Sequence, residues 1–84
     1  MTDDEYIISQ LAELAPGQPA LVVLKSGLRC VVHDIAWGLD AEEASSHVTT
    51  NISPRREGRE IDHFTTDQIA FIEIAGRKVF VAED

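Results

Sequence analysis

The stretch FTTDQIAFIEIAGRKVFVAE, residues 64–83, decides the fold class of this chain. The segments IAFIEIA and KVFVAE predict two short β-strands. Gly76 and Arg77 lie between them and predict a tight reversal, so the strands are expected to form a hairpin. Before the first strand, Thr65 and Gln68 have the spacing of a capping box, which predicts one capped helical turn. The chain is therefore expected to end in an antiparallel β unit.

A second hairpin is expected nearer the N-terminus. ALVVLK (residues 20–25) is a short, apolar and β-branched run, and LRCVVHDIAW (residues 28–37) predicts a longer strand. Ser26 and Gly27 predict a two-residue turn between them. Apolar side chains occur on both faces of the longer run, which predicts a bulge near His33 or burial on two sides, as in a strongly bent strand.

Two further strands are expected between these hairpins. HVTTNIS (residues 47–53) alternates and ends before Pro54, and EIDHF (residues 60–64) resumes the strand pattern. The acidic segment GLDAEEASS (residues 38–46) and the charged segment RREGRE (residues 55–60) predict connecting loops. The β region thus extends over residues 20–83 and contains about five or six strands.

A helix is expected over residues 2–15. Thr2 and Glu5 have the spacing of a capping box, and the acids of the first turn suit the positive end of the helix dipole. Pro16 disfavours helical geometry in the preceding residue, so the helix should end at Ala15. An apolar stripe recurs at i, i+4 and i+7 and is formed by Ile7, Leu11 and Leu14.

The expected fold class is therefore α+β, in a single domain over residues 1–84. The N-terminal helix packs on a strongly bent antiparallel sheet or small barrel, whose closure would remove exposed strand edges. Cys30 is the single cysteine, which excludes an intramolecular disulfide, and its place in a β-rich run predicts a core position. The N-terminus lacks the positive charge of a signal peptide, and no apolar run is long enough for a membrane span. A cytoplasmic location is thus the expectation.

The order of these elements resembles that of Sm-like and SH3-like barrels. Val22, Leu24 and Gly27 match the hydrophobic-x-Leu-x-x-Gly opening of the first Sm motif. The chain departs from that family at Val32, where the family has glycine, and in the segments GLDAEEASS and IEIAG, which lack the residues of its nucleotide pocket. The resemblance therefore implies an Sm-like fold without the uridine-binding residues.

The chain also resembles the Rof family, small acidic inhibitors of the transcription terminator Rho. The resemblance lies in a helix before the first strand, in Asp67-Gln68-Ile69-Ala70 as the D-x-I-A turn, and in a final short hairpin with the acidic end VFVAED. It covers most of the chain in the order of elements and few residues in identity. It implies that an acidic surface binds the nucleic-acid site of a protein partner, with candidate residues on the helix at Asp3, Asp4 and Glu5.

The net charge of −8, from 15 acids against 7 bases, favours the same class of partner. A strongly acidic domain repels nucleic acid and anionic membranes at long range, so a protein with a basic surface is the expected partner, unless the charge serves solubility alone. Trp37 is the single tryptophan and a candidate hot spot of binding, or else the plug of one barrel end. Beside it, an acidic loop contributes Asp40, Glu42 and Glu43. The expected function is a non-enzymatic interaction or regulatory module without a cofactor.

Two other classes of function remain open. One is an Sm-like RNA binder, as a single chain or a homo-oligomer, whose anion or RNA contacts come from a charged turn containing Arg55, Arg56 and Arg59. Glu57 and Glu60 lie within this turn and cancel much of its field. The other is a metal-dependent enzyme that uses three histidines, although their spacing matches no metal motif: His33, His47 and His63.

Overall fold

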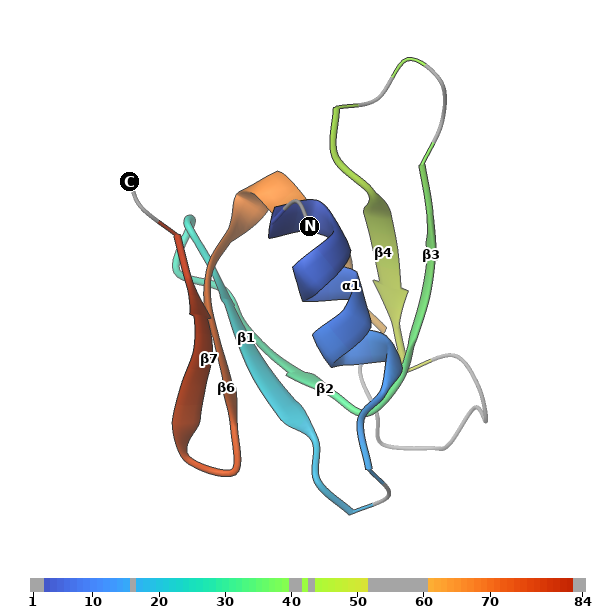
Figure 1. Ribbon diagram of the computed structural model, residues 1–84. Helices are drawn as coiled ribbons and strands as arrows, with labels where there is room; N and C mark the ends of the chain where they lie inside the picture. Colours follow the sequence, from blue (N-terminus) through green and yellow to red (C-terminus); the bar gives the residue numbers. More distant parts are fainter. Residues whose placement is uncertain (1–2, 16, 40–41, 43, 52–60, 83–84) are drawn as a thin grey trace.

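The computed structural model describes residues 3–15, 17–39, 42, 44–51 and 61–82 (Figure 1). Helix α1 comes first, and short strands follow it. The elements are α1 (Asp3–Ala12), β1 (Ala20–Leu24), β2 (Arg29–Val32), β3 (Ile35–Gly38), β4 (His47–Thr50), β5 (His63–Thr65), the 3-10 turn η1 (Thr66–Gln68), β6 (Ile69–Ile74) and β7 (Arg77–Val81). No helix in this part of the chain has both the length and the apolar character needed to cross a membrane.

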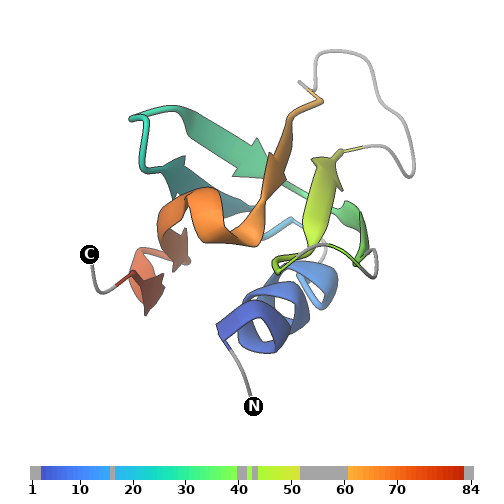
Figure 2. The same cartoon turned by 90° about the horizontal axis from the view of Figure 1, so that it is seen from above.

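The strands form two antiparallel sheets, which confirms the predicted α+β class. One sheet has the order β2-β1-β6-β7 and the other the order β3-β4-β5. Seven strands lie in the described ranges, so the expected number of about five or six was too low. The sheets do not close on each other, so an Sm-like or SH3-like barrel stays a prediction. Figures 1 and 2 show α1 between the β6–β7 hairpin and the β3–β4 pair.

The long strand expected over residues 28–37 is divided between the two sheets, since β2 ends at Val32 and β3 begins at Ile35. Asn51 stabilises this corner and is only 2% exposed. Its Oδ1 accepts a 2.7 Å hydrogen bond from the amide of His33, and its Nδ2 donates one of 2.9 Å to the carbonyl of Val31. The prediction of one bent strand with a bulge near His33, or with burial on two sides, was therefore wrong: the strand is interrupted at His33, and Val31 and Trp37 are exposed.

The first hairpin has a longer turn than predicted. The amide of Leu24 donates to the carbonyl of Leu28, and the amide of Gly27 donates to the carbonyl of Leu24, both at 2.8 Å. These bonds enclose a loop over residues 25–27, in which Gly27 has a φ of 96°. A loop that ends in a glycine at positive φ is the usual three-residue alternative to a two-residue hairpin turn.

The terminal hairpin is present, but its turn lies one residue earlier than predicted. Ala75 has a φ of 55° and Gly76 a φ of 77°, while Arg77 already belongs to β7. Two successive residues at positive φ match the right-handed twist of the strands that they join. Before β6, the side chain of Gln68 accepts a 3.0 Å hydrogen bond from the amide of Thr65, which confirms the predicted capped turn.

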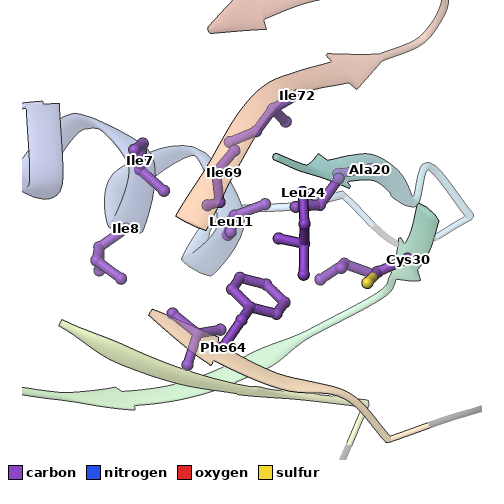
Figure 3. Packing of buried hydrophobic residues seen from close by; sticks show 12 residues of the cluster. Ile7, Ile8, Leu11, Ala20, Leu24, Cys30, Phe64, Ile69 and Ile72 are labelled. Atoms are coloured by element: carbon purple, nitrogen blue, oxygen red, sulfur yellow. The ribbon is translucent and has the colours of Figure 1, made fainter. Parts of the chain in front are cut away.

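Helix α1 supplies one wall of the core (Figure 3). It ends at Ala12 instead of the predicted Ala15, because Pro16 has no N–H to donate to the carbonyl of Ala12. The predicted capping residue Thr2 lies outside the described residues. The core contains the predicted Cys30 and consists of Ile7, Ile8, Leu11, Ala20, Val22, Leu24, Cys30, Val32, Val48, Phe64, Ile69 and Ile72.

Candidate functional site

A groove of about 450 Å³ runs between α1 and β3. It brings together an aromatic side chain, apolar side chains and carboxylates from segments far apart in the sequence. Its lining consists of Asp4, Glu5, Ile8, Ser9, Ala12, Glu13, Trp37 and Ser46. Tryptophan next to a mixed apolar and charged wall is typical of protein-binding surfaces.

The geometry of α1 produces the helical wall of this groove. Residues three and four apart lie on one face of a helix, so Glu5 and Ser9 form one row, which Glu13 continues just past the end of α1, and Ile8 and Ala12 form the next. Ile8 belongs to the core, whereas Ala12 is exposed and small. The helix therefore offers a shallow apolar surface between carboxylates.

Trp37 forms the opposite wall. It is paired with the fully buried Val48 across β3 and β4, so both side chains point to the inner face of the three-stranded sheet. The core does not extend as far as Trp37, which stays 52% exposed, and Leu39, just beyond the end of β3, is also exposed. An apolar surface thus remains open on the side of the sheet that faces α1.

Asp4 fixes the start of α1 to the residue before β4 and to η1. Its Oδ1 accepts hydrogen bonds from the Ser46 amide at 2.7 Å and the Thr66 hydroxyl at 2.6 Å, and its Oδ2 accepts a 2.7 Å bond from the Ser46 hydroxyl. Burial of the carboxyl group raises the pKa of Asp4, but these three hydrogen bonds outweigh burial and lower that pKa overall. Asp4 is therefore ionised at neutral pH and holds the wall of the groove in place.

The described bases all lie away from the groove between α1 and β3. The bases lie on the four-stranded sheet and its first hairpin, at Lys25, Arg29, Arg77 and Lys78. Helix α1 contains acids and no base, and no base lines the groove beside Trp37. The described residues that line the groove thus contribute negative charge and no positive charge, which favours a cationic partner over polyphosphate.

The predicted site residues are only partly brought together. Glu5 and Trp37 share the groove, whereas the exposed Asp3 lines a separate hollow of about 240 Å³ with Lys25, Thr66 and Asp67. Glu42 is exposed between β3 and β4. The remaining candidates lie outside the described residues and are Asp40, Glu43, Arg55, Arg56 and Arg59.

Sequence reasoning did not identify Ile8, Ala12 and Glu13 as residues of this surface. Their spacing from Glu5 was the available signal, because positions 5, 8, 12 and 13 lie on one side of a helix. The prediction considered only the acids of the first helical turn and so missed Glu13, which lines the groove together with Trp37.

The histidines do not form a triad. His47 and His63 lie on neighbouring strands, with ring centroids 6.3 Å apart, and Nδ1 of His63 is 2.9 Å from the hydroxyl of Thr49. His33 lies at the corner between the sheets. Among the residues that the structure describes, no group of three His, Cys, Asp or Glu side chains could hold a metal ion.

Comparisons with protein-family models, with curated proteins and with solved structures find no match for this chain. The resemblance to Sm-like proteins and to the Rof family therefore stays a prediction from the sequence.

Proposed function

We propose that this protein is a non-enzymatic interaction module that binds a basic protein partner in the groove between α1 and β3. The observation that carries the proposal is the position of Trp37, half exposed opposite a helix face whose charged groups are all carboxylates. Binding of this kind needs no catalytic residues, because shape and charge select the partner.

The chemistry of the groove fits a lysine or arginine side chain next to an apolar one. The stem of such a cation can cover the ring of Trp37 while its charged end reaches Glu5 or Glu13. Tryptophan supplies a large contact area at a small cost in conformational entropy. Ile8 and Ala12 provide the apolar floor for a neighbouring residue of the partner.

The proposal extends to regulation. Surfaces that bind nucleic acid are rich in lysine and arginine, and an acidic groove with an exposed tryptophan can cover such a surface. Masking a nucleic-acid-binding site is also the function that the resemblance to the Rof family implies. The net charge of −8 favours fast encounter with such a partner at low salt.

The test is affinity capture from a lysate of the native host, with and without nuclease, using matched variants. Trp37→Ala, Glu5→Gln and Glu13→Gln change the groove. Two control variants lie in the four-stranded sheet, away from the groove. Glu73→Gln in β6 matches the glutamine variants, and Val81→Ala in β7 matches Trp37→Ala because it truncates an apolar side chain that is 58% exposed. Captured proteins are compared by mass spectrometry.

A protein that survives nuclease, is lost with Trp37→Ala and the glutamine variants, and is retained by both controls supports the proposal. If the groove variants and the controls lose the captured protein to the same extent, the assignment of the groove as the binding surface is contradicted. Capture that disappears with nuclease would instead favour the RNA-binding alternative.

A further inference from the structure

The two sheets have four edge strands, β2 and β7 in one and β3 and β5 in the other. On three of them a side chain occupies a backbone hydrogen-bonding position. Asn51 bonds to β2, the hydroxyl of Tyr6 donates a 2.8 Å bond to the carbonyl of Val79 in β7, and Gln68 accepts a bond from the amide of Thr65 in β5. Such contacts prevent an edge from pairing with another chain.

The outer edge of β3 differs from the other three. In the part of the chain that the structure describes, neither a strand nor a side chain pairs with it, and Figure 1 shows β3 at the margin of the three-stranded sheet. The strand is four residues long, from Ile35 to Gly38, and ends beside the groove. It therefore offers backbone donors and acceptors next to the surface proposed to bind the partner.

The register of β3 against β4 identifies which backbone groups face outward. The amide of Asn51 donates a 2.9 Å bond to the carbonyl of Asp34, and hydrogen-bonded positions alternate along an antiparallel pair. Ala36 and Gly38, paired with Thr49 and His47, therefore direct their backbone groups toward β4. The N–H and C=O groups of Ile35 and Trp37 point to the outer edge.

Trp37 can therefore contact a partner through its backbone and through its side chain. Its backbone faces the open edge, and its side chain faces the groove toward α1. A strand added to this edge would direct the side chain opposite Trp37 to the same face of the sheet. That side chain would lie beside the wall that carries Glu5 and Glu13, where a cation is favoured.

We propose that the partner's bound segment is an extended peptide with a lysine or arginine at every second position, which adds to the outer edge of β3 as a further strand. This inference rests on the proposed function, because it names the conformation and chemistry of the segment that enters the groove. Backbone hydrogen bonds to Ile35 and Trp37 hold the segment, and the acidic groove selects its lysine or arginine residues.

The test uses a short synthetic peptide of alternating Lys and Val as the probe, titrated against the full chain. Trp37 is the single tryptophan, so its fluorescence reports binding at this site. Two further peptides carry N-methyl groups on alternate amides, one on each edge of the extended backbone, so that charge and side chains stay the same. A Glu and Val peptide of the same length is the charge control.

Strand addition predicts that N-methylation of the edge facing β3 weakens binding about tenfold or more, because it removes backbone hydrogen bonds, while methylation of the other edge has little effect. Binding of the parent peptide should also slow hydrogen exchange at the amides of Ile35 and Trp37. The Glu and Val peptide should not bind.

Equal affinity of all the Lys and Val peptides would overturn strand addition, and so would the absence of any binding by the parent peptide. The proposed function is judged separately, by capture of a partner that depends on Trp37, Glu5 and Glu13. If only the peptide experiment fails, strand addition is rejected and the proposed groove stands. If partner capture does not depend on the groove residues, the assigned surface itself is rejected.

Discussion

The carboxylate of Asp4 accepts a hydrogen bond of 2.6 Å from the hydroxyl of Thr66, 62 residues later in the chain. This contact joins the first turn of α1 to η1, and the two bonds from Ser46 join it to the start of β4. The wall of the groove formed by α1 therefore depends on a carboxylate that was expected to contact a partner. Its internal hydrogen bonds make it a structural residue of the proposed site.

Replacement of Asp4 by asparagine should lower the free energy of unfolding by about 2 kcal/mol, since charge-assisted hydrogen bonds to Ser46 and Thr66 are weakened. Asp3→Asn is the matched control, because Asp3 is exposed and its removal costs only a helix-dipole interaction of about 0.3–1 kcal/mol. Urea unfolding of both variants gives the comparison. Equal losses at the two positions would contradict the role assigned to Asp4.

The stability that Asp4 contributes should also depend on pH. The pKa of this carboxyl group is lowered in the folded state from its ordinary value of 3.8, so the unfolded chain binds the proton more readily. The stabilisation is fully present above that ordinary value and is lost as the pH falls through the lower folded value. The difference in unfolding free energy between the wild type and Asp4→Asn should therefore shrink below about pH 4. If this difference in unfolding free energy instead grew on acidification, the pKa of Asp4 would be raised in the folded state and not lowered.

The local patterns predicted the elements better than they predicted their pairing. The capped turn at Thr65 and Gln68, the terminal hairpin and the helix all form, because each depends on signals only a few residues apart. The division of residues 28–37 between two sheets depends on Asn51, which lies far along the chain. A propensity for strand cannot indicate where such a distant side chain interrupts it.

The candidate site was predictable in its chemistry and only partly in its geometry. The acidity of α1 and the single Trp37 are visible in the sequence, and the structure brings Glu5 and Trp37 to one groove. The internal use of Asp4 was not predictable, because a carboxylate in a first helical turn normally faces solvent near the positive dipole end. The open edge of β3 required the sheet order, which no local pattern contains.

Asn51 should be one of the most sensitive positions of the described residues to substitution. Asn51→Ala leaves the amide of His33 and the carbonyl of Val31 without side-chain partners and places alanine at a φ of 59°. A loss of about 2–4 kcal/mol in unfolding free energy is expected. Asn51→Gly separates the two causes, because glycine accepts this φ and still lacks the side chain. Urea unfolding should thus rank the wild type above Asn51→Gly and Asn51→Gly above Asn51→Ala.

Ala75 offers the opposite case, a position where substitution should stabilise the protein. Its φ of 55° lies in the left-handed region, which costs a residue with a Cβ roughly 1 kcal/mol, and it is followed by Gly76 at 77°. Asn-Gly is the preferred pair for such a hairpin turn, so Ala75→Asn should raise the free energy of unfolding by about 0.5–1 kcal/mol. Gly76→Ala is the paired control and should lower it by a similar amount, although no neighbouring atom obstructs the new Cβ. Urea midpoints at constant slope would measure both changes, and a shift in the same direction for the two variants would show that backbone strain does not govern this turn.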